Sequence, residues 1–162
     1  EQVAAGMKPT HVLTEPFVFC FGMPTGNGIT LPLVLIYLFS KSKRLKSISR
    51  MSLIPSIFNI NEPVVFGLPV VMNGFLLVPF ILTHTLTAAL TYWLTSIGFV
   101  GKMYMNLPWA TPSPVLGYLA AGGSIGGIVI VFINFALGMV IFYPFWKSYE
   151  KAEVAKFNGE TA

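Results

Sequence analysis

The chain has 162 residues, of which 54% are hydrophobic and only 10% are charged, and it contains no aspartate. Typical soluble domains carry about 25% charged residues, because a water-facing surface needs charge. The composition therefore excludes an ordinary soluble enzyme and, despite a formal net charge of +4, a soluble nucleic-acid-binding domain. The single cysteine, Cys20, excludes an internal disulfide framework and a cysteine-cluster metal site, and we expect no metal and no cofactor.

The charged residues gather in two clusters, at positions 41–50 and 147–156. Between positions 51 and 146 only Glu62 and Lys102 carry charge. Each charge at the middle of a bilayer costs about 3 kcal/mol on insertion scales, so this pattern predicts bilayer-spanning segments. The chain starts at Glu1 without a charged-then-apolar signal segment, and we expect it to be the C-terminal part of a longer membrane protein.

In chain order, we predict three regions. Residues 1–14 form a polar extracellular lead-in, residues 15–146 a membrane-embedded substrate-binding domain, and residues 147–162 a cytoplasmic tail. The first apolar stretch, 16–40, is interrupted at 22–28 by three glycines and a proline, which break a helix. Because lipid cannot hydrogen-bond exposed backbone, this break must face protein or a water-filled cavity.

Two later segments, 74–99 and 128–146, are long and apolar enough to cross the membrane. The positive-inside tendency places the first charged cluster on the cytoplasmic side. If both clusters are cytoplasmic, an even number of crossings must separate them, and these two segments fit. The proline-rich segments around Glu62 and Trp109 must then enter and leave on the same side, from the cytoplasm and from outside respectively. We therefore predict an all-α fold of polytopic membrane helices with two re-entrant, proline-broken hairpins that meet near the midplane, where transporters build substrate sites.

Glu62 is the main candidate for chemistry, because an ionisable residue within a membrane segment is a functional-site candidate by default. Its neighbours Asn59 and Asn61 add hydrogen-bond donors and acceptors, which suits a hydroxyl-rich ligand. The alternative is a protonated or helix-capping glutamate that only ties down its hairpin. Trp109 has two interpretations as well, a platform for a sugar ring or a member of the interfacial aromatic belt. His84 is interpreted as a helix-packing residue.

Three blocks carry a resemblance to a known family: the segment that starts Phe58-Asn59-Ile60-Asn61-Glu62-Pro63, then Pro108-Trp109-Ala110-Thr111-Pro112, and Tyr143-Pro144-Phe145-Trp146-Lys147. Together they resemble the membrane IIC components of the bacterial phosphoenolpyruvate-dependent sugar phosphotransferase system, in the lactose, cellobiose and chitobiose group. The likeness covers about residues 9–151.

The resemblance implies a subunit of a multi-protein sugar phosphotransferase. Such proteins are multi-pass, dimeric proteins of the bacterial cytoplasmic membrane, bind a β-linked disaccharide outside and carry it inward. The phosphocysteine of a IIB partner, recharged through IIA, HPr and enzyme I, phosphorylates the C6 hydroxyl. The resemblance assigns Glu62 to that hydroxyl, with general-base chemistry, and Trp109 to the sugar ring. It places Asn59, Asn61 and Thr111 in the same substrate-binding set.

Two departures from the family pattern stand out. Ala110 takes the place of a threonine, and the family's histidine in a Gly-Ile-His-Gly stretch has no match. We therefore expect the chain to carry only part of the sugar site. Two other readings stay open: an ion-coupled secondary transporter in which Glu62 is a proton or ion site, and a purely structural membrane fragment.

Overall fold

The computed structural model describes residues 9–22 and 30–159, and within these ranges every regular element is helical. The elements are α1 (Glu15–Phe17), the π-helical turn η1 (Val18–Gly22), α2 (Leu31–Leu38), α3 (Lys43–Ile57), α4 (Glu62–Gly67), the 3-10 turn η2 (Val70–Met72), α5 (Gly74–Ser96), α6 (Ser113–Ala120) and α7 (Ile125–Gly159). The predicted all-helical class is confirmed for these residues. The predicted break at 22–28 lies, apart from Gly22, outside them.

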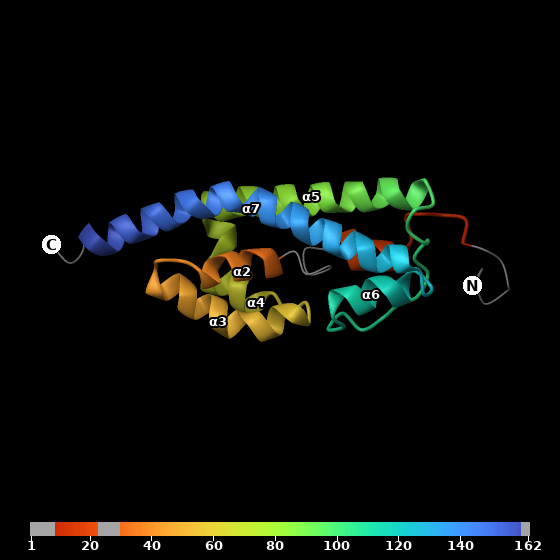
Figure 1. Ribbon diagram of the computed structural model, residues 1–162, viewed down its shortest axis with the longest axis horizontal. Helices are drawn as coiled ribbons and strands as arrows, with labels where there is room; N and C mark the ends of the chain where they lie inside the picture. Colours follow the sequence, from red (N-terminus) through yellow and green to blue (C-terminus); the bar gives the residue numbers. More distant parts are fainter. Residues whose placement is uncertain (1–8, 23–29, 160–162) are drawn as a thin grey trace.

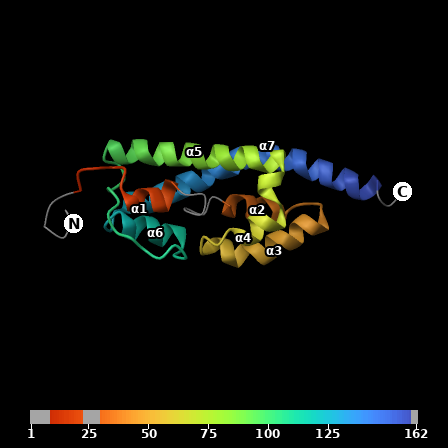
Figure 2. The same ribbon diagram turned by 180° about the vertical axis from the view of Figure 1, so that it is seen from behind.

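Two long apolar helices, α5 and α7, run antiparallel and pack side by side along the length of the molecule (Figures 1 and 2). Both are long and apolar enough to cross a membrane. The 23 residues of α5 span about 35 Å, slightly more than the hydrocarbon thickness of a bilayer. Helix α7 has 35 residues and continues without interruption through the second charged cluster. The two predicted crossings therefore correspond to α5 and to the first part of α7.

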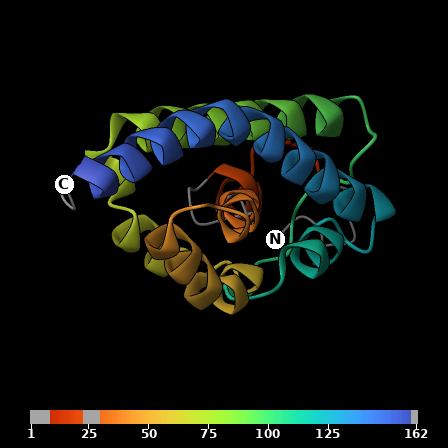
Figure 3. The same ribbon diagram turned by 60° about the vertical axis from the view of Figure 1, so that its left-hand side comes forward.

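Two hairpins approach each other along one side of the α5–α7 pair (Figures 1 and 2). The first hairpin consists of α3, the turn 58–61 and α4; the second consists of the irregular segment 101–112 and α6. They start from opposite ends of the long helices, so that their tips face one another. Helix α2 lies between the long helices and the first hairpin, packed against both α3 and α7 (Figure 3).

The buried apolar side chains form two separate clusters, one for each hairpin. The first cluster joins α2, α3 and α4 to the start of α5 and the second half of α7. It includes Leu33, Leu45, Val64, Leu76 and Phe142. The second joins η1, α6 and the other ends of α5 and α7, and includes Phe21, Met103, Leu116 and Ile130. Buried polar residues occupy the positions between them, namely Thr83 and Thr87 on α5, Asn134 on α7 and Asn59, Asn61 and Ser113 at the hairpin tips.

The two charged clusters lie at the same end of the molecule. Arg44, in the first turn of α3, forms an ion pair with Glu153 of α7 at 2.6 Å. The Glu150 carboxylate accepts hydrogen bonds from the Ser40 hydroxyl and the Lys41 backbone N–H, both at 2.5 Å. The hydrogen bond that Arg44 donates to the Glu153 carboxylate raises the pKa of Arg44 above its already high value, so this guanidinium remains charged. Two antiparallel helices thus separate the clusters, as the parity argument predicted.

Candidate functional site at the hairpin tips

The tip of the first hairpin turns at Asn59. This residue has a φ of 61°, in the left-handed region that asparagine tolerates better than other residues with a Cβ atom. The turn closes because the N–H groups of Asn59 and Ile60 donate to carbonyls in the last turn of α3, at 3.2 and 3.0 Å. Pro63 then lies in the first turn of α4, where its missing N–H costs nothing. The local sequence therefore ends one helix and starts the next within four residues.

The side chain of Asn59 joins the two hairpins. Its Nδ2 donates to the carbonyl of Thr111 at 2.7 Å and to the carbonyl of Trp109 at 3.3 Å. Its Oδ1 accepts from the hydroxyl of Ser113 at 2.6 Å. Asn59 is 1% exposed and Ser113 is 6% exposed. We call this set, Asn59 and Ser113 with the carbonyls of Trp109 and Thr111, the tip clasp.

Asn61 makes a second buried connection at the same tip. Its Oδ1 accepts a hydrogen bond from the hydroxyl of Thr30, which directly precedes α2. Both residues are almost fully buried, Asn61 at 2% and Thr30 at 1% exposure. The tip of the first hairpin is therefore tied to the start of the central helix as well as to the second hairpin.

Glu62 and Trp109 differ from the two asparagines because their side chains reach the surface of this chain. Glu62 is the first residue of α4 and is exposed, and the indole of Trp109 is 47% exposed. The half-buried Thr111 donates its hydroxyl to the carbonyl of Pro108 at 2.7 Å. The structure thus brings together the two segments that carry all five predicted site residues, as the sequence predicted.

Within that group, the five side chains have different surroundings. Both amide hydrogens of Asn59 are used inside the protein, so this side chain has no donor left for a ligand. The Glu62 carboxylate and the Trp109 indole are the groups that remain available. Ser113 and Thr30 belong to the site's framework and were absent from the predicted set. No signal in the sequence marks them, because a serine after a proline and a threonine before a helix are ordinary.

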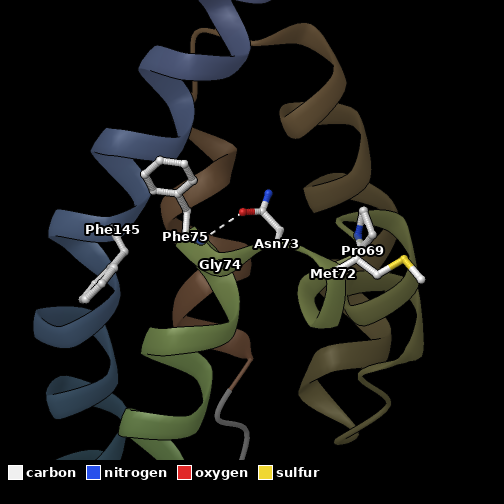
Figure 4. A pocket seen from close by; sticks show the side chains of 6 residues that line it. All are labelled: Pro69, Met72, Asn73, Gly74, Phe75 and Phe145. Carbon is white, nitrogen blue, oxygen red and sulfur yellow. Dashed lines mark hydrogen bonds between the residues drawn. The ribbon is translucent and has the colours of Figure 1, made fainter.

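Of three cavities in the described part of the chain, one adjoins the hairpin tips and two lie toward the charged end of the molecule. A small apolar one of about 250 Å³ adjoins Ser113 and is lined by Leu31, Ile57, Pro114, Val131, Phe132 and Phe135 as well. One of about 550 Å³ opens at the start of α5, where Asn73 accepts from the backbone N–H of Phe75 at 3.0 Å (Figure 4). One of about 630 Å³ lies at the charged end, beside Phe39 and Lys147. None of the five predicted site residues lines any of these three.

Metal-binding geometry is a separate question, since carboxylates and imidazoles are common ligands. Within residues 9–22 and 30–159, no three histidine, cysteine, aspartate or glutamate side chains gather in a position to hold a metal ion.

Comparison with known proteins gives a consistent family. A profile of the family described as "Phosphotransferase system, EIIC" matches residues 1–83. The "Lichenan permease IIC component" of Bacillus subtilis is 40% identical over 156 residues, which cover 95% of this chain and 34% of that protein. The "PTS system cellobiose-specific EIIC component" of Geobacillus stearothermophilus is 39% identical over 148 residues, 90% of this chain and 33% of its own length. The chain thus spans about a third of these curated relatives.

A solved structure shares the fold. The crystal structure of the transporter ChbC, described as the IIC component of the N,N'-diacetylchitobiose-specific phosphotransferase system, superimposes with a TM-score of 0.89 at 39% sequence identity. The match covers 98% of this chain and 38% of that one. The arrangement of helices and hairpins described above is therefore shared with part of that transporter.

Proposed function

The chain belongs to the EIIC family of the phosphotransferase system, and from this premise we propose that it is the substrate-binding part of a sugar permease. The full-length protein carries a β-linked disaccharide of the cellobiose, lactose or chitobiose type inward while a IIB partner phosphorylates its C6 hydroxyl. The observation that supports this most is the meeting of the two hairpin tips. It brings the backbone of Trp109 into hydrogen-bond contact with Asn59, three residues before Glu62.

The chemistry proposed for Glu62 follows from its carboxylate. An ionised carboxylate accepts the hydrogen bond of the C6 hydroxyl and so orients that oxygen. As the hydroxyl oxygen bonds to phosphorus, the bond between phosphorus and the cysteine sulfur of the IIB partner breaks. The hydroxyl proton passes to Glu62, which acts as general base. Trp109 offers an apolar ring face on which the C–H groups of a pyranose stack.

The membrane placement is part of the same proposal. We place α5 and the first part of α7 across the bacterial cytoplasmic membrane and treat both hairpins as re-entrant, the first from the cytoplasm and the second from outside. The facing tips support this, because irregular backbone at membrane depth must be satisfied by protein groups, and the tip clasp does so. In the full-length protein we further propose multi-pass insertion, a homodimer and phosphate supply through IIA, HPr and enzyme I.

The proposal is tested with the full-length transporter in vesicles, using labelled cellobiose, lactose and chitobiose. We expect sugar to appear inside only as the phosphate ester, and only when phosphoenolpyruvate and the phosphotransfer proteins, including the cognate IIB protein, are present. Uptake of unmodified sugar driven by a proton gradient alone would instead identify an ion-coupled transporter with Glu62 as its proton or ion site. No binding and no uptake of any of the three sugars would reject both functions.

A matched control is available within the chain. Glu15 is followed by Pro16 and starts α1, as Glu62 is followed by Pro63 and starts α4, and both glutamates are exposed. We expect Glu62→Gln to lower IIB-dependent phosphorylation by at least about a hundredfold and Glu15→Gln to leave it near the wild-type level. Equal loss in the two variants would indicate a general effect of removing a carboxylate before a proline.

A further inference from the structure

We infer that the tip clasp is a positioning device: Asn59 and Ser113 hold the Glu62 segment and the Trp109 segment in one fixed arrangement, without themselves contacting the sugar. This inference rests on the proposed function, because it concerns how the two proposed sugar-contacting groups are set relative to each other. It assigns Ser113, which lies outside the predicted site, a specific task. It also changes the role of Asn59, which the sequence predicted to bind the substrate and which here positions other residues.

The first argument concerns what else holds the tips together. The first hairpin packs into one apolar cluster and α6 into the other, and the two clusters share no residue. Helix α6 packs mainly against α7, whereas α3 packs mainly against α2 and α4. The buried apolar clusters therefore anchor each hairpin to its own end of the molecule, and neither cluster contains residues of both hairpins.

The second argument is the small cavity beside the clasp. About 250 Å³ of space lies between Ile57 at the end of α3, Ser113 and the facing residues of α7. The side chains of the two hairpins therefore leave part of the space beside the clasp unfilled. The hydrogen bonds of the clasp are consequently the contacts that define how the tips meet.

The third argument is the direction of the bonds. Asn59 holds the carbonyl of Trp109 and the carbonyl of Thr111, on either side of Ala110. These two hydrogen bonds thus fix the backbone of residues 109–111, which carries the indole. Ser113 completes the set by fixing the amide's orientation, since its hydroxyl donates to Oδ1 and leaves Nδ2 directed at the two carbonyls. Removing either side chain leaves buried polar groups without partners, which loosens the junction.

The test uses two clasp variants of the full-length transporter. Ser113→Ala removes the donor to Oδ1. Asn59→Gly removes the amide but suits the φ of 61°, so that the turn itself is retained. The matched control is Ser148→Ala, since the exposed Ser148 donates only within α7, to the carbonyl of Pro144.

The first readout does not involve sugar. Nitroxide labels at Phe66→Cys on α4 and Leu119→Cys on α6 report the distance between the hairpins, because both side chains reach the surface. We expect a narrow distance distribution in the otherwise wild-type protein and in the Ser148→Ala control. Broadened or shifted distributions are expected for both clasp variants. Unchanged distributions in both clasp variants would overturn the inference, whether or not the transporter binds a disaccharide.

The second readout is disaccharide affinity measured with and without the indole. We expect Ser113→Ala to weaken binding about tenfold when Trp109 is present, and less than about twofold in a Trp109→Ala background, because the clasp acts through the position of the indole. An equal loss in both backgrounds would overturn the positioning role, since Ser113 would then act on the sugar directly or on the fold. If the wild-type protein binds none of the three sugars, the proposed function is rejected. The distances between the two labels still test whether the tip clasp positions the hairpins.

Discussion

Glu62 and Asn59 are three positions apart and have opposite surroundings. Asn59 is buried with both amide hydrogens engaged, whereas the Glu62 carboxylate is exposed on this chain. A buried amide whose donors are all used stabilises a particular backbone arrangement but has little to offer a ligand. A carboxylate at the surface of a hairpin tip can accept a hydrogen bond from a hydroxyl group of a substrate. The two residues therefore invite different experiments.

The Glu62→Gln variant separates binding from phosphoryl transfer. Glutamine keeps the shape and one acceptor, so the contact with the C6 hydroxyl largely survives, at a cost of about 1 kcal/mol. It removes the negative charge that assists proton loss, and general-base assistance is worth about 10²–10⁴ in rate. We expect sugar affinity in detergent to weaken modestly and IIB-dependent phosphorylation in vesicles to fall by at least about a hundredfold.

The opposite result has a clear meaning. If binding collapses and the residual bound sugar is phosphorylated at a normal rate, Glu62 is a recognition residue only. The general-base role would then be abandoned.

Helices α6 and α7 approach so closely that their backbones are almost in contact. A Cβ atom added at Gly117 would lie 2.4 Å from the carbonyl oxygen of Gly127, and one added at Gly127 would lie 2.1 Å from that of Gly117. Small residues at a helix crossing are typical of membrane proteins, because they let backbones pack without side chains between them. A Cβ atom added at Gly126 would likewise lie 2.4 Å from the carbonyl oxygen of Phe99, so the start of α7 is closely packed on this second side as well.

This crossing predicts the effect of a single methyl group. Gly117→Ala should lower the free energy of unfolding by about 1–3 kcal/mol, because backbone atoms cannot move aside as a flexible side chain can. Gly74→Ala is the control, since nothing lies within 4 Å of a Cβ atom there. We expect that control to be neutral or slightly stabilising in a denaturant titration in detergent. Equal effects of the two substitutions would contradict the crossing.

The α5–α7 interface contains a polar seam. Thr83, Thr87, Thr91 and Thr95 recur every four residues on the buried face of α5. The Asn134 amide of α7 donates to the Thr91 hydroxyl at 2.9 Å. The interior of a membrane offers no water to bond these polar groups. A hydrogen bond between two helices there typically stabilises their association by about 0.6–2 kcal/mol.

Thr91→Val tests this seam. It should destabilise the protein by about 1 kcal/mol, because the buried Asn134 amide loses its acceptor. Thr85→Val provides the comparison: Thr85 also donates to a carbonyl of its own helix, that of Ile81 at 2.9 Å, but is exposed. The difference between the two unfolding free energies measures the bond between the helices. A difference near zero would show that the bond contributes nothing.

Within residues 9–22 and 30–159, most of the charged side chains belong to the two clusters at one end of the molecule. The Arg44–Glu153 ion pair joins α3 to α7 there, and the Glu150 hydrogen bonds join the loop before α3 to α7. Helix α5 ends with Ser96 at the opposite end of the molecule (Figure 1). For the proposed topology we expect cysteines at the exposed positions Ser47 and Ser148 to react with a membrane-impermeant reagent from the cytoplasmic side. A cysteine at Ser96 should react only from outside. Reaction of the first two from different sides would reject this arrangement.

The sequence alone determined the features that depend on local composition. The apolar lengths of α5 and α7 and the shared end of the two charged clusters were predictable, because hydropathy and charge parity need only the order of residues. The contact between the Glu62 and Trp109 segments followed from the same parity.

Only the tertiary structure decided which polar groups are free. The partners of Asn59 lie 50 to 54 positions away, and whether an amide is consumed or available depends on which carbonyls packing brings to it. The sequence places Asn59 and Asn61 beside Glu62 in one motif, and all three were predicted to bind the substrate. Folding buries the two asparagines against other segments and leaves the glutamate exposed, because hydrogen-bond partners are set by long-range geometry that no local pattern encodes.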